Sequence, residues 1–519
     1  MDKAFGDFQT PPALVEQVLS VLQRQGKNWT RLLEPTCGVG NFLTGALKAS
    51  YFNFQEAYGI ELQAHHLEEA KNSTTFLPPS QSLQWIQGSI FDIRLNDELR
   101  WHTNGKLLIL GNPPWVTNAE LGRLNSQNLP TKYNVKRSMG LSARTGESNF
   151  DLAEAVFHKL ILELQDQNPT VAMLCKTTVA RNILLFAHQQ NLPIRRSFIR
   201  EIDAKRWFGV AVKACLFYME IEAGCQSAPT PFFVDLETPT PSTVVEVRGG
   251  KMIADELNYR SYQHLEGGCA LTWRQGVKHD LASVMELTLD GEGWRNKLGT
   301  HVEAEAERIF PLLKGADLKR GDIASPTRGI IITQYHLSEE TDQLAGQFPN
   351  LLAYLEQHRA LFAQRKSSIY RNRPAFAMFG VGHYTFVPYK VAVAGLYAPP
   401  IFRLVTPAHG KPVIFDDTCY FIACQSMAQA RLLNTLLNHS VSQAFFASIC
   451  FADAKRPITK GLLQRLNLVA VLEHIGHDVL LDLAKTHHAN SSCEPISEQA
   501  WKEAFATLFV DAQTQPLLL

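Results

Sequence analysis

A turn at residues 111–115, with the sequence Gly-Asn-Pro-Pro-Trp, is the segment best suited to chemistry. Asn112 offers a side-chain carbonyl oxygen, and Pro113 offers a backbone carbonyl with no competing N–H. Together these oxygens can accept both hydrogens of a planar amino group, which lets its nitrogen aim a lone pair at an electrophile. Pro114 stiffens the turn, and Trp115 offers an indole on which the ring bearing the amino group can stack. The alternative is an ordinary strand-ending turn with a packed tryptophan, because short motifs often arise by chance.

The residues before this turn predict a short buried strand. Leu107–Leu110 form an apolar run that glycine and two prolines end. Such runs are typical of parallel sheets covered on both faces, where ligands bind beyond the carboxyl ends of the strands. Three earlier strands are predicted: a short strand that meets a glycine turn within Arg31–Leu43, a strand at Ala57–Leu62, and a strand-to-loop transition at Gln84–Asp92. The predicted fold class is therefore α/β with a mostly parallel sheet, and the turn lies at its carboxyl edge.

The other strand ends carry residues that suit a ligand. Gly38 and Gly40 follow the first strand, where glycines let the backbone approach a ligand at a helix start. No GxGxxG pattern or P-loop lysine is present, so pyrophosphate binding is not expected. Glu61 ends the second strand, where a carboxylate typically accepts hydrogen bonds from a ribose diol. Taken alone, a glycine turn between a strand and a helix is the simpler interpretation.

A helix is predicted near the amino terminus. Apolar residues at helical spacing define its buried face: Val15, Val18, Leu19 and Leu22. Thr10 is expected to cap this helix, with Pro11 in the first turn. Phe8 and the Thr10 region are also expected to border a ligand pocket, although a capped amphipathic helix explains the pattern without one.

This series of motifs resembles the class I S-adenosylmethionine-dependent methyltransferases. The family's cofactor motif, Asp/Glu-Pro-x-x-Gly-x-Gly-x-Phe, is matched at Glu34, Pro35, Gly38, Gly40 and Phe42. Its Asn/Asp-Pro-Pro-aromatic motif is matched at Asn112–Trp115, and Phe8–Pro11 is similar to its motif X. The order of these motifs resembles the gamma class of enzymes that methylate adenine N6 in DNA.

The resemblance implies a Rossmann-like methyltransferase domain that binds S-adenosyl-L-methionine. It implies that the cofactor is bound by Phe8, Thr10, Pro11, Glu34, Pro35, Gly38, Gly40, Glu61 and Asn112. Family members carry Asp directly after the glycine of motif III, to bind the adenine of the cofactor. Ser89 occupies that position here, so Asp92 is the favoured candidate and Ser89 the alternative.

The resemblance also implies an aromatic side chain that stacks on the target base opposite Trp115. Phe208 matches best and Trp207 is the alternative, while two packed core aromatics are the simpler interpretation. No cysteine nucleophile is required, and Cys37 lacks the Pro-Cys setting of enzymes that methylate cytosine C5.

Length and composition predict more than one domain. The 519 residues exceed the size of a single core. Loop-rich composition at residues 223–243 predicts a catalytic domain at 1–240. A mixed α+β target-recognition domain with a helical carboxyl-terminal portion is predicted at 241–519, with a cleft between the two. Only seven residues precede Phe8, so no nuclease domain is expected ahead of the catalytic domain.

Cysteine usage and hydropathy indicate the cellular compartment. The nine cysteines are scattered without metal-ligand spacing, so neither disulfides nor a metal site is expected. The amino terminus lacks the apolar core of a signal peptide, and no apolar run reaches spanning length. The chain is therefore expected to be cytoplasmic, with no membrane segment.

Charge is unevenly distributed although the chain is neutral overall. Residues 357–415 contain no acidic residue and interleave basic with aromatic side chains, which favours contact with nucleic acid. The alternative is a solvated basic face. The residues predicted to bind double-stranded DNA are Arg365, Lys366, Arg371, Arg373 and Lys390, with Lys455 and Arg456 from a second basic segment.

These observations together predict a site-specific DNA adenine N6-methyltransferase that acts on a flipped-out adenine. Its expected setting is a restriction–modification or related defence system, with a separate restriction endonuclease or defence subunits as partners. One alternative is an enzyme that methylates an RNA base or a protein glutamine. Another is a catalytically silent DNA-binding subunit of a defence complex.

Overall fold

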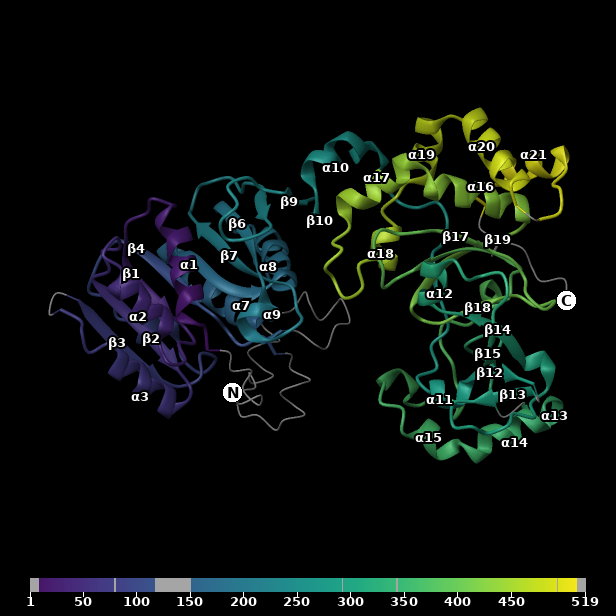
Figure 1. Cartoon of the computed structure of the whole chain (residues 1–519), viewed down its shortest axis with the longest axis horizontal. Coiled ribbons are helices and arrows are strands. Elements are labelled where there is room, and N and C mark those ends of the chain that lie inside the picture. The colour runs from purple at the N-terminus through teal and green to yellow at the C-terminus, as the bar shows by residue number, and fades with distance from the viewer. Residues whose placement is uncertain are drawn as a thin grey trace. The chain divides into compact units, whose positions relative to one another are not determined.

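The computed structural model describes residues 9–78, 81–116, 151–291, 293–341, 344–491 and 493–510. The chain divides into two compact units, residues 1–257 and 258–519 (Figure 1). This boundary falls later than the predicted residue 240, because β9 (Thr243–Arg248) and β10 (Lys251–Ile253) extend the sheet of the first unit. Helix α10 (Glu256–Tyr262) spans the boundary.

One large sheet forms the frame of the first unit, with the strand order β10-β9-β8-β6-β7-β5-β4-β1-β2-β3. Its remaining strands are β1 (Trp29–Glu34), β2 (Glu56–Glu61), β3 (Ser82–Gln87), β4 (Lys106–Gly111), β5 (Thr170–Lys176), β6 (Ile194–Ile202), β7 (Ala214–Ile221) and β8 (Thr230–Phe233). Strands β1 to β5 are mutually parallel, whereas β7 runs antiparallel between β5 and β6. The order reverses between β1 and β4, and ligands bind at such a switch point.

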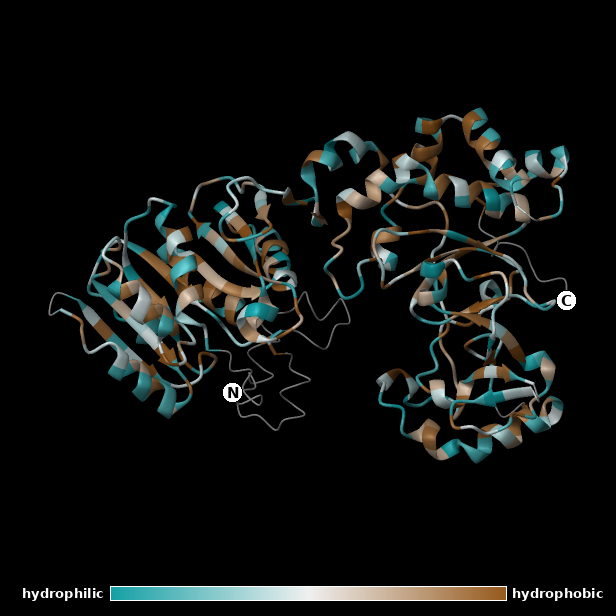
Figure 2. Cartoon of the chain, viewed as in Figure 1, coloured by the Kyte–Doolittle hydropathy of each residue, from teal (hydrophilic) through white to brown (hydrophobic). Residues whose placement is uncertain are grey.

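The central strands are apolar because helices cover both faces of the sheet. Every residue of β7 and all but the last of β5 are buried, and Figure 2 shows these strands as hydrophobic. The helices are α1 (Pro12–Gln23), α2 (Asn41–Lys48), α3 (Ala64–Ser73), α4 (Leu95–Glu98), α7 (Leu152–Leu164), α8 (Thr177–Gln189) and α9 (Ala204–Phe208). Two contact groups result, one of α1, α2 and α3 and one of α4, α7 and α8.

The predicted cap of the first helix is wrong. Helix α1 begins at Pro12 with Pro11 as the N-cap, and no side chain makes a capping hydrogen bond. Proline needs no such bond at its own nitrogen and has a backbone angle suited to the first turn. The Thr10 hydroxyl is therefore not used by this helix.

The second unit is a mixed α+β structure with two smaller sheets. Strands β11 (Arg274–Gln275), β19 (Cys419–Cys424), β16 (Tyr389–Ala394) and β17 (Arg403–Val405) form one sheet. Strands β13 (Gly293–Asn296), β12 (Glu286–Asp290), β15 (Arg328–Ile331), β14 (Ile309–Leu313) and β18 (Ile414–Phe415) form the other. The buried core of this second sheet packs against residues of α14 (Pro349–Gln357) and α15 (Arg359–Ala363).

The carboxyl-terminal part of the second unit is helical. It contains α16 (Met427–Asn438), α17 (Ser440–Ile449), α18 (Lys460–Leu463), α19 (Leu468–Ile475), α20 (His477–Ala489) and α21 (Glu498–Ala506). Earlier helices of the unit are α11 (Ala282–Met285), α12 (Gly315–Arg320), α13 (Leu344–Gln347), α14 (Pro349–Gln357) and α15 (Arg359–Ala363). None of the helices in the described part of the chain has the length and apolar content to span a bilayer.

A buried histidine makes the first unit sensitive to acid. His158 of α7 is 4% exposed and packs on Phe186 of α8, with ring centroids 4.1 Å apart. Neither ring nitrogen has a hydrogen-bond partner, and burial lowers the pKa of His158 from 6.5 to about 4. As the pH falls below 6.5, the unfolded chain binds a proton that the folded chain does not bind until about pH 4. The stabilisation is therefore complete above pH 6.5 and declines below it.

We expect the free energy of unfolding to fall by about 1 kcal/mol between pH 7.5 and pH 5.5 because of this residue. His158→Leu should remove that part of the pH dependence, since leucine does not titrate. The measurement is urea unfolding followed by circular dichroism at both pH values. His188→Leu, at an exposed position of α8, is the matched control. An unchanged pH dependence in His158→Leu would contradict this account.

Candidate active site

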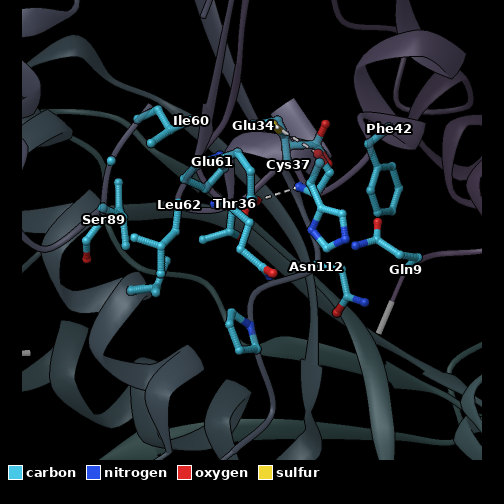
Figure 3. A pocket seen from close by; sticks show the side chains of 18 of the residues that line it. Gln9, Glu34, Thr36, Cys37, Phe42, Ile60, Glu61, Leu62, Ser89 and Asn112 are labelled. Atoms are coloured by element: carbon cyan, nitrogen blue, oxygen red, sulfur yellow. Dashed lines mark hydrogen bonds between the residues drawn. The ribbon is translucent and has the colours of Figure 1, made fainter. Parts of the chain in front are cut away.

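A pocket of about 800 Å³, its open mouth included, lies beyond the carboxyl ends of β1, β2 and β4 (Figure 3). The predicted site residues that line it are Thr10, Glu34, Pro35, Gly38, Glu61, Ser89, Asn112 and Pro114. Residues from every predicted strand end thus meet at one place, because carboxyl ends of parallel strands share one edge of a sheet. In Figure 3, Ser89 lies at the opposite end of the pocket from Gln9 and Asn112.

Glu61 holds the glycine turn in place. One carboxylate oxygen accepts a hydrogen bond from the Gly38 N–H at 2.8 Å, and the other accepts from the Gln63 N–H at 2.8 Å. A carboxylate has about four acceptor positions, so both oxygens keep a lone pair for a further donor. The side chain is 8% exposed and borders the pocket, so it can serve a ligand while it fixes the turn.

Glu34 is the more deeply buried acid of the pocket, at 3% exposure. Burial raises its pKa well above the ordinary value, and the nearby Glu61 raises it further, while a hydrogen bond from the Leu43 N–H opposes the shift. Burial, followed by the two acids, also raises the pKa of the Cys37 thiol. Cys37 is thus kept protonated, which suits a packed side chain rather than a nucleophile.

The two glycines of the turn have different tasks. Gly38 has φ +53°, and a Cβ there would lie 2.4 Å from the Gln9 Oε1. Gly40 has φ +76° and is the N-cap of α2, where a Cβ would lie 3.0 Å from the Ala70 Cβ on α3. Gly38 therefore admits a neighbouring side chain, and Gly40 allows two helices to pack closely.

Gln9 is a lining residue that the sequence analysis did not single out. Its Oε1 accepts a hydrogen bond from the Val39 N–H at 3.1 Å. Asn41 donates from Nδ2 to the Thr10 carbonyl oxygen at 2.9 Å. Residues 9 and 10 are thus attached to the glycine turn. The position of Gln9 within the motif X match was the available signal.

The two candidates of motif III are placed differently. Ser89 lines the pocket, whereas Asp92 is exposed, donates its backbone N–H to the Ser89 carbonyl at 3.0 Å and does not line the pocket. The favoured assignment to Asp92 therefore does not agree with this geometry, because the turn after β3 directs that residue to solvent. Pro11, Gly40 and Pro113 also lie outside the lining, and Phe8 lies outside the described residues.

Asn112 borders the pocket just after β4 and contacts the amino-terminal segment. Its Nδ2 donates a hydrogen bond to the Thr10 Oγ1 at 3.2 Å. In this arrangement the Nδ2 end of the carboxamide faces the amino-terminal segment. Pro114 lines the pocket beside it.

Trp115 and Phe208 lie together, but not as two faces of a slot. Their ring centroids are 5.0 Å apart and their planes meet at 76°, an edge-to-face contact. Both side chains are buried, at 5% and 9% exposure, and the indole Nε1 donates to the Leu174 carbonyl oxygen at 3.4 Å. The expected sandwich is therefore not formed in this conformation, since no planar ring fits between rings that touch. Trp207 is half-buried beside Arg206, whose guanidinium lies 4.7 Å from the indole centroid.

Two of the predicted DNA-binding residues, Lys390 and Arg365, make hydrogen bonds inside the second unit. Lys390 is 1% exposed and donates from Nζ to the Val413 carbonyl oxygen at 2.8 Å, and burial lowers its pKa to about 7. Arg365 donates to the carbonyl oxygens of Phe362, His279, Ala377 and Ala375, and its guanidinium lies 3.7 Å from the Tyr370 centroid. Both are internal structural cations, because the fold supplies their acceptors.

The other predicted cations are placed at the surface or near it. Lys366, Arg371 and Arg373 are exposed. Lys455 is exposed as well, and Arg456 is half-buried. The described residues contain no group of three or more His, Cys, Asp or Glu side chains arranged to hold a metal ion.

The fold and the pocket define a class of protein. The order β3-β2-β1-β4-β5-β7-β6, with β7 antiparallel, is that of the class I S-adenosylmethionine-dependent methyltransferases. The pocket lies at its switch point and contains the acid, glycine and asparagine residues of that class.

No protein-family model matches the sequence. The chain is 38% identical over 472 residues to the Type II methyltransferase M.NspV of Nostoc sp. (strain ATCC 29411 / PCC 7524), covering 89% of this chain and 96% of that protein. The Type IIL restriction-modification enzyme MmeI, solved in complex with DNA, matches 95% of this chain and 75% of its own. Its TM-score is 0.53 at 13% identity, so that likeness concerns the fold. The chain belongs to the Type II DNA methyltransferases of restriction–modification systems, which confirms the family resemblance.

The pocket fits the cofactor of this class, S-adenosyl-L-methionine. That molecule carries positive charge on its sulfonium and amino groups, and the pocket presents two buried acids, Glu34 and Glu61. Glu61 keeps acceptor capacity for a diol, and Ser89 supplies a hydroxyl at the far end. The chain's own hydrogen bonds already hold the turn that the cofactor would approach.

We expect Gly38→Ala to weaken cofactor binding by about tenfold, because the added methyl displaces Gln9 and strains a left-handed backbone. Isothermal titration with S-adenosylmethionine measures this effect. Gly26→Ala is the matched control, since Gly26 has φ +63° but nothing within 4 Å of an added Cβ. The control should lose only about 1 kcal/mol of stability and bind the cofactor normally. Equal affinities for the two variants would contradict the role given to the turn.

Proposed function

We propose that the protein is the modification enzyme of a restriction–modification system and methylates N6 of adenine in double-stranded DNA. The observation that carries the proposal is the Asn112 carboxamide at the cofactor pocket, within the Asn-Pro-Pro-Trp turn that ends β4. The gamma-like order of motifs favours adenine. A separate restriction endonuclease is the proposed partner.

The chain's own residues bind and orient the reacting amine. The Asn112 Oδ1 and the Pro113 carbonyl would accept the two N6 hydrogens, which raises electron density on that nitrogen and turns its lone pair toward the pocket. The cofactor, when bound, supplies an electrophilic methyl group. Fixing the amine next to it converts an encounter between two molecules into a positioned reaction, which accounts for most of the proposed rate enhancement.

The target adenine would have to leave the duplex to reach this turn, at a cost of a few kcal/mol of lost stacking. A base stacked between two rings needs them parallel and roughly 7 Å apart, twice the contact distance of carbon atoms. Trp115 and Phe208 are closer and tilted, so one of them must turn aside when the base enters. We propose that the pair then stacks on the two faces of the adenine.

DNA contact in the second unit is proposed for fewer residues than charge alone indicated. Arg403 and Lys411 from the acid-free stretch also donate to backbone carbonyls, and Arg359 pairs with Glu356. Lys366, Arg371 and Arg373 are the exposed cations of the stretch for which no such structural partner is observed. They are the proposed phosphate contacts, with Lys455 as a further one.

We expect purified protein and isotope-labelled S-adenosylmethionine to place the label on N6 of adenine in DNA, detected by mass spectrometry of the nucleosides. Asn112→Ala should lower the rate by about 1,000-fold or more, measured at saturating cofactor. Label on cytosine, RNA or protein, or an unchanged rate in Asn112→Ala, would refute the proposal. A protein that binds DNA and never transfers the methyl group would support the silent-subunit alternative.

We expect Lys366→Ala, Arg371→Ala and Arg373→Ala each to weaken DNA binding and to lower the salt dependence of log K by about 1. Fluorescence anisotropy at several salt concentrations measures both. Lys502→Ala removes an exposed charge from α21 and should change neither quantity. Arg365→Ala should instead destabilise the second unit, because it leaves four carbonyl acceptors without their donor. Salt slopes unchanged in all three variants would exclude this segment as a DNA contact.

A further inference from the structure

The Thr10 hydroxyl is placed to act on the catalytic amide. Thr10 is 4% exposed, and its Oγ1 accepts the hydrogen bond from the Asn112 Nδ2 at 3.2 Å. The hydroxyl does not cap α1, whose N-cap is Pro11. Its observed partner is therefore the side chain that the proposed reaction depends on.

The rest of the segment is attached to the glycine turn. The Thr10 carbonyl accepts from the Asn41 Nδ2 at 2.9 Å, and the Gln9 Oε1 accepts from the Val39 N–H at 3.1 Å. Residues 9 and 10 thus make one hydrogen bond to Val39 of the glycine turn, one to Asn41 at the start of α2 and a third to Asn112. A shift of the turn would move the hydroxyl, and with it the carboxamide.

The direction of the hydrogen bond has a chemical consequence. A threonine hydroxyl can accept or donate, so either end of a carboxamide could face it. A substrate amino group presents hydrogens, so the Asn112 oxygen must face the substrate and the Nδ2 must face Thr10. The observed donor, Nδ2, agrees with that requirement.

We infer that Thr10 is a positioning residue for Asn112. Its hydroxyl holds the carboxamide so that the oxygen is presented to the amine, and its backbone links this orientation to the cofactor turn. This inference rests on the proposed function and gives Thr10 a task distinct from binding the cofactor. The effect belongs to the methyl-transfer step, because loss of this hydrogen bond would loosen the orientation of the Asn112 oxygen toward the amine.

The test compares Thr10→Val, which keeps the shape and loses the hydroxyl, with Thr10→Ser, which keeps the hydroxyl. The backbone bond to Asn41 can form in both variants. Single-turnover methyl transfer to DNA is measured at saturating cofactor and DNA, and cofactor affinity by titration calorimetry. We expect Thr10→Val to lower the transfer rate by about 10- to 100-fold with cofactor Kd within about 3-fold of wild type. Thr10→Ser should transfer within about 3-fold of wild type.

A wild-type rate in Thr10→Val would overturn the inference. So would a weakened cofactor Kd with a normal rate at saturation, because Thr10 would then be a cofactor contact. If Thr10→Val lost both the transfer rate and the cofactor affinity, and Thr10→Ser restored both, Thr10 would again be a cofactor contact and the inference would fail. The assay counts transferred label on any base of the DNA. If the wild-type enzyme modifies a base other than adenine, the proposed function is refuted, but the comparison of the Thr10 variants can still be made.

Discussion

Two carboxylates buried at the ends of adjacent parallel strands determine how the active site is built. Glu34 and Glu61 are 3% and 8% exposed, and burial raises the pKa of Glu34, with a further contribution from the nearby Glu61. The two acids accept hydrogen bonds from backbone N–H groups of the glycine turn and of α2. These bonds hold the loop at the start of α2, where a side-chain N-cap would otherwise be needed. Helix α2 has no such cap, since its N-cap is Gly40. A positively charged ligand would offset the electrostatic effect of Glu61 on Glu34. Binding of such a ligand would therefore stabilise the site.

The sequence predicts this part of the fold well because its signals are local. A buried parallel strand is an apolar run ended by turn residues. Strands β2 and β4 each end within a residue of the predicted position, and β1 and β3 end within the predicted strand-to-turn transitions. Parallel strands then bring their ends to one edge whatever the helices between them do. The Asn112 and Gly38 positions follow from that geometry alone.

The remaining assignments depend on packing between distant segments, which no local pattern records. Lys390 looks like a surface cation in sequence, but it lies on a central strand and faces the Val413 carbonyl. Asp92 is separated from Ser89 by one tight turn, and that turn decides which side chain meets the pocket. Gln9 was missed because its contact with the Gly38–Val39 turn joins segments that are far apart in the chain.

The lack of acids in residues 357–415 therefore has two physical causes. Internal side chains such as Arg365 and Lys390 donate to neutral carbonyl oxygens, so the fold supplies their acceptors without an acid from the segment itself. An acid nearby would pair with them and withdraw them from those carbonyls. The exposed Lys366, Arg371 and Arg373 are the second cause, because a segment without acids leaves their positive potential at the surface. Half of the cations in this segment make structural contacts inside the protein, and the exposed cations can still form a positive surface.

The Trp115–Phe208 pair, which lies outside the lining of the pocket, bears on how such a site would admit a base. An edge-to-face contact contributes about 0.5–1.5 kcal/mol beyond the burial of the rings. In the proposed reaction, a base that enters gains roughly 1–3 kcal/mol from stacking on an aromatic side chain. The Trp115–Phe208 contact is therefore weak enough for a base to replace, while it keeps both rings buried when no base is bound. In the proposed reaction, stacking on the two faces of the base would offset the free energy that the pair loses on opening.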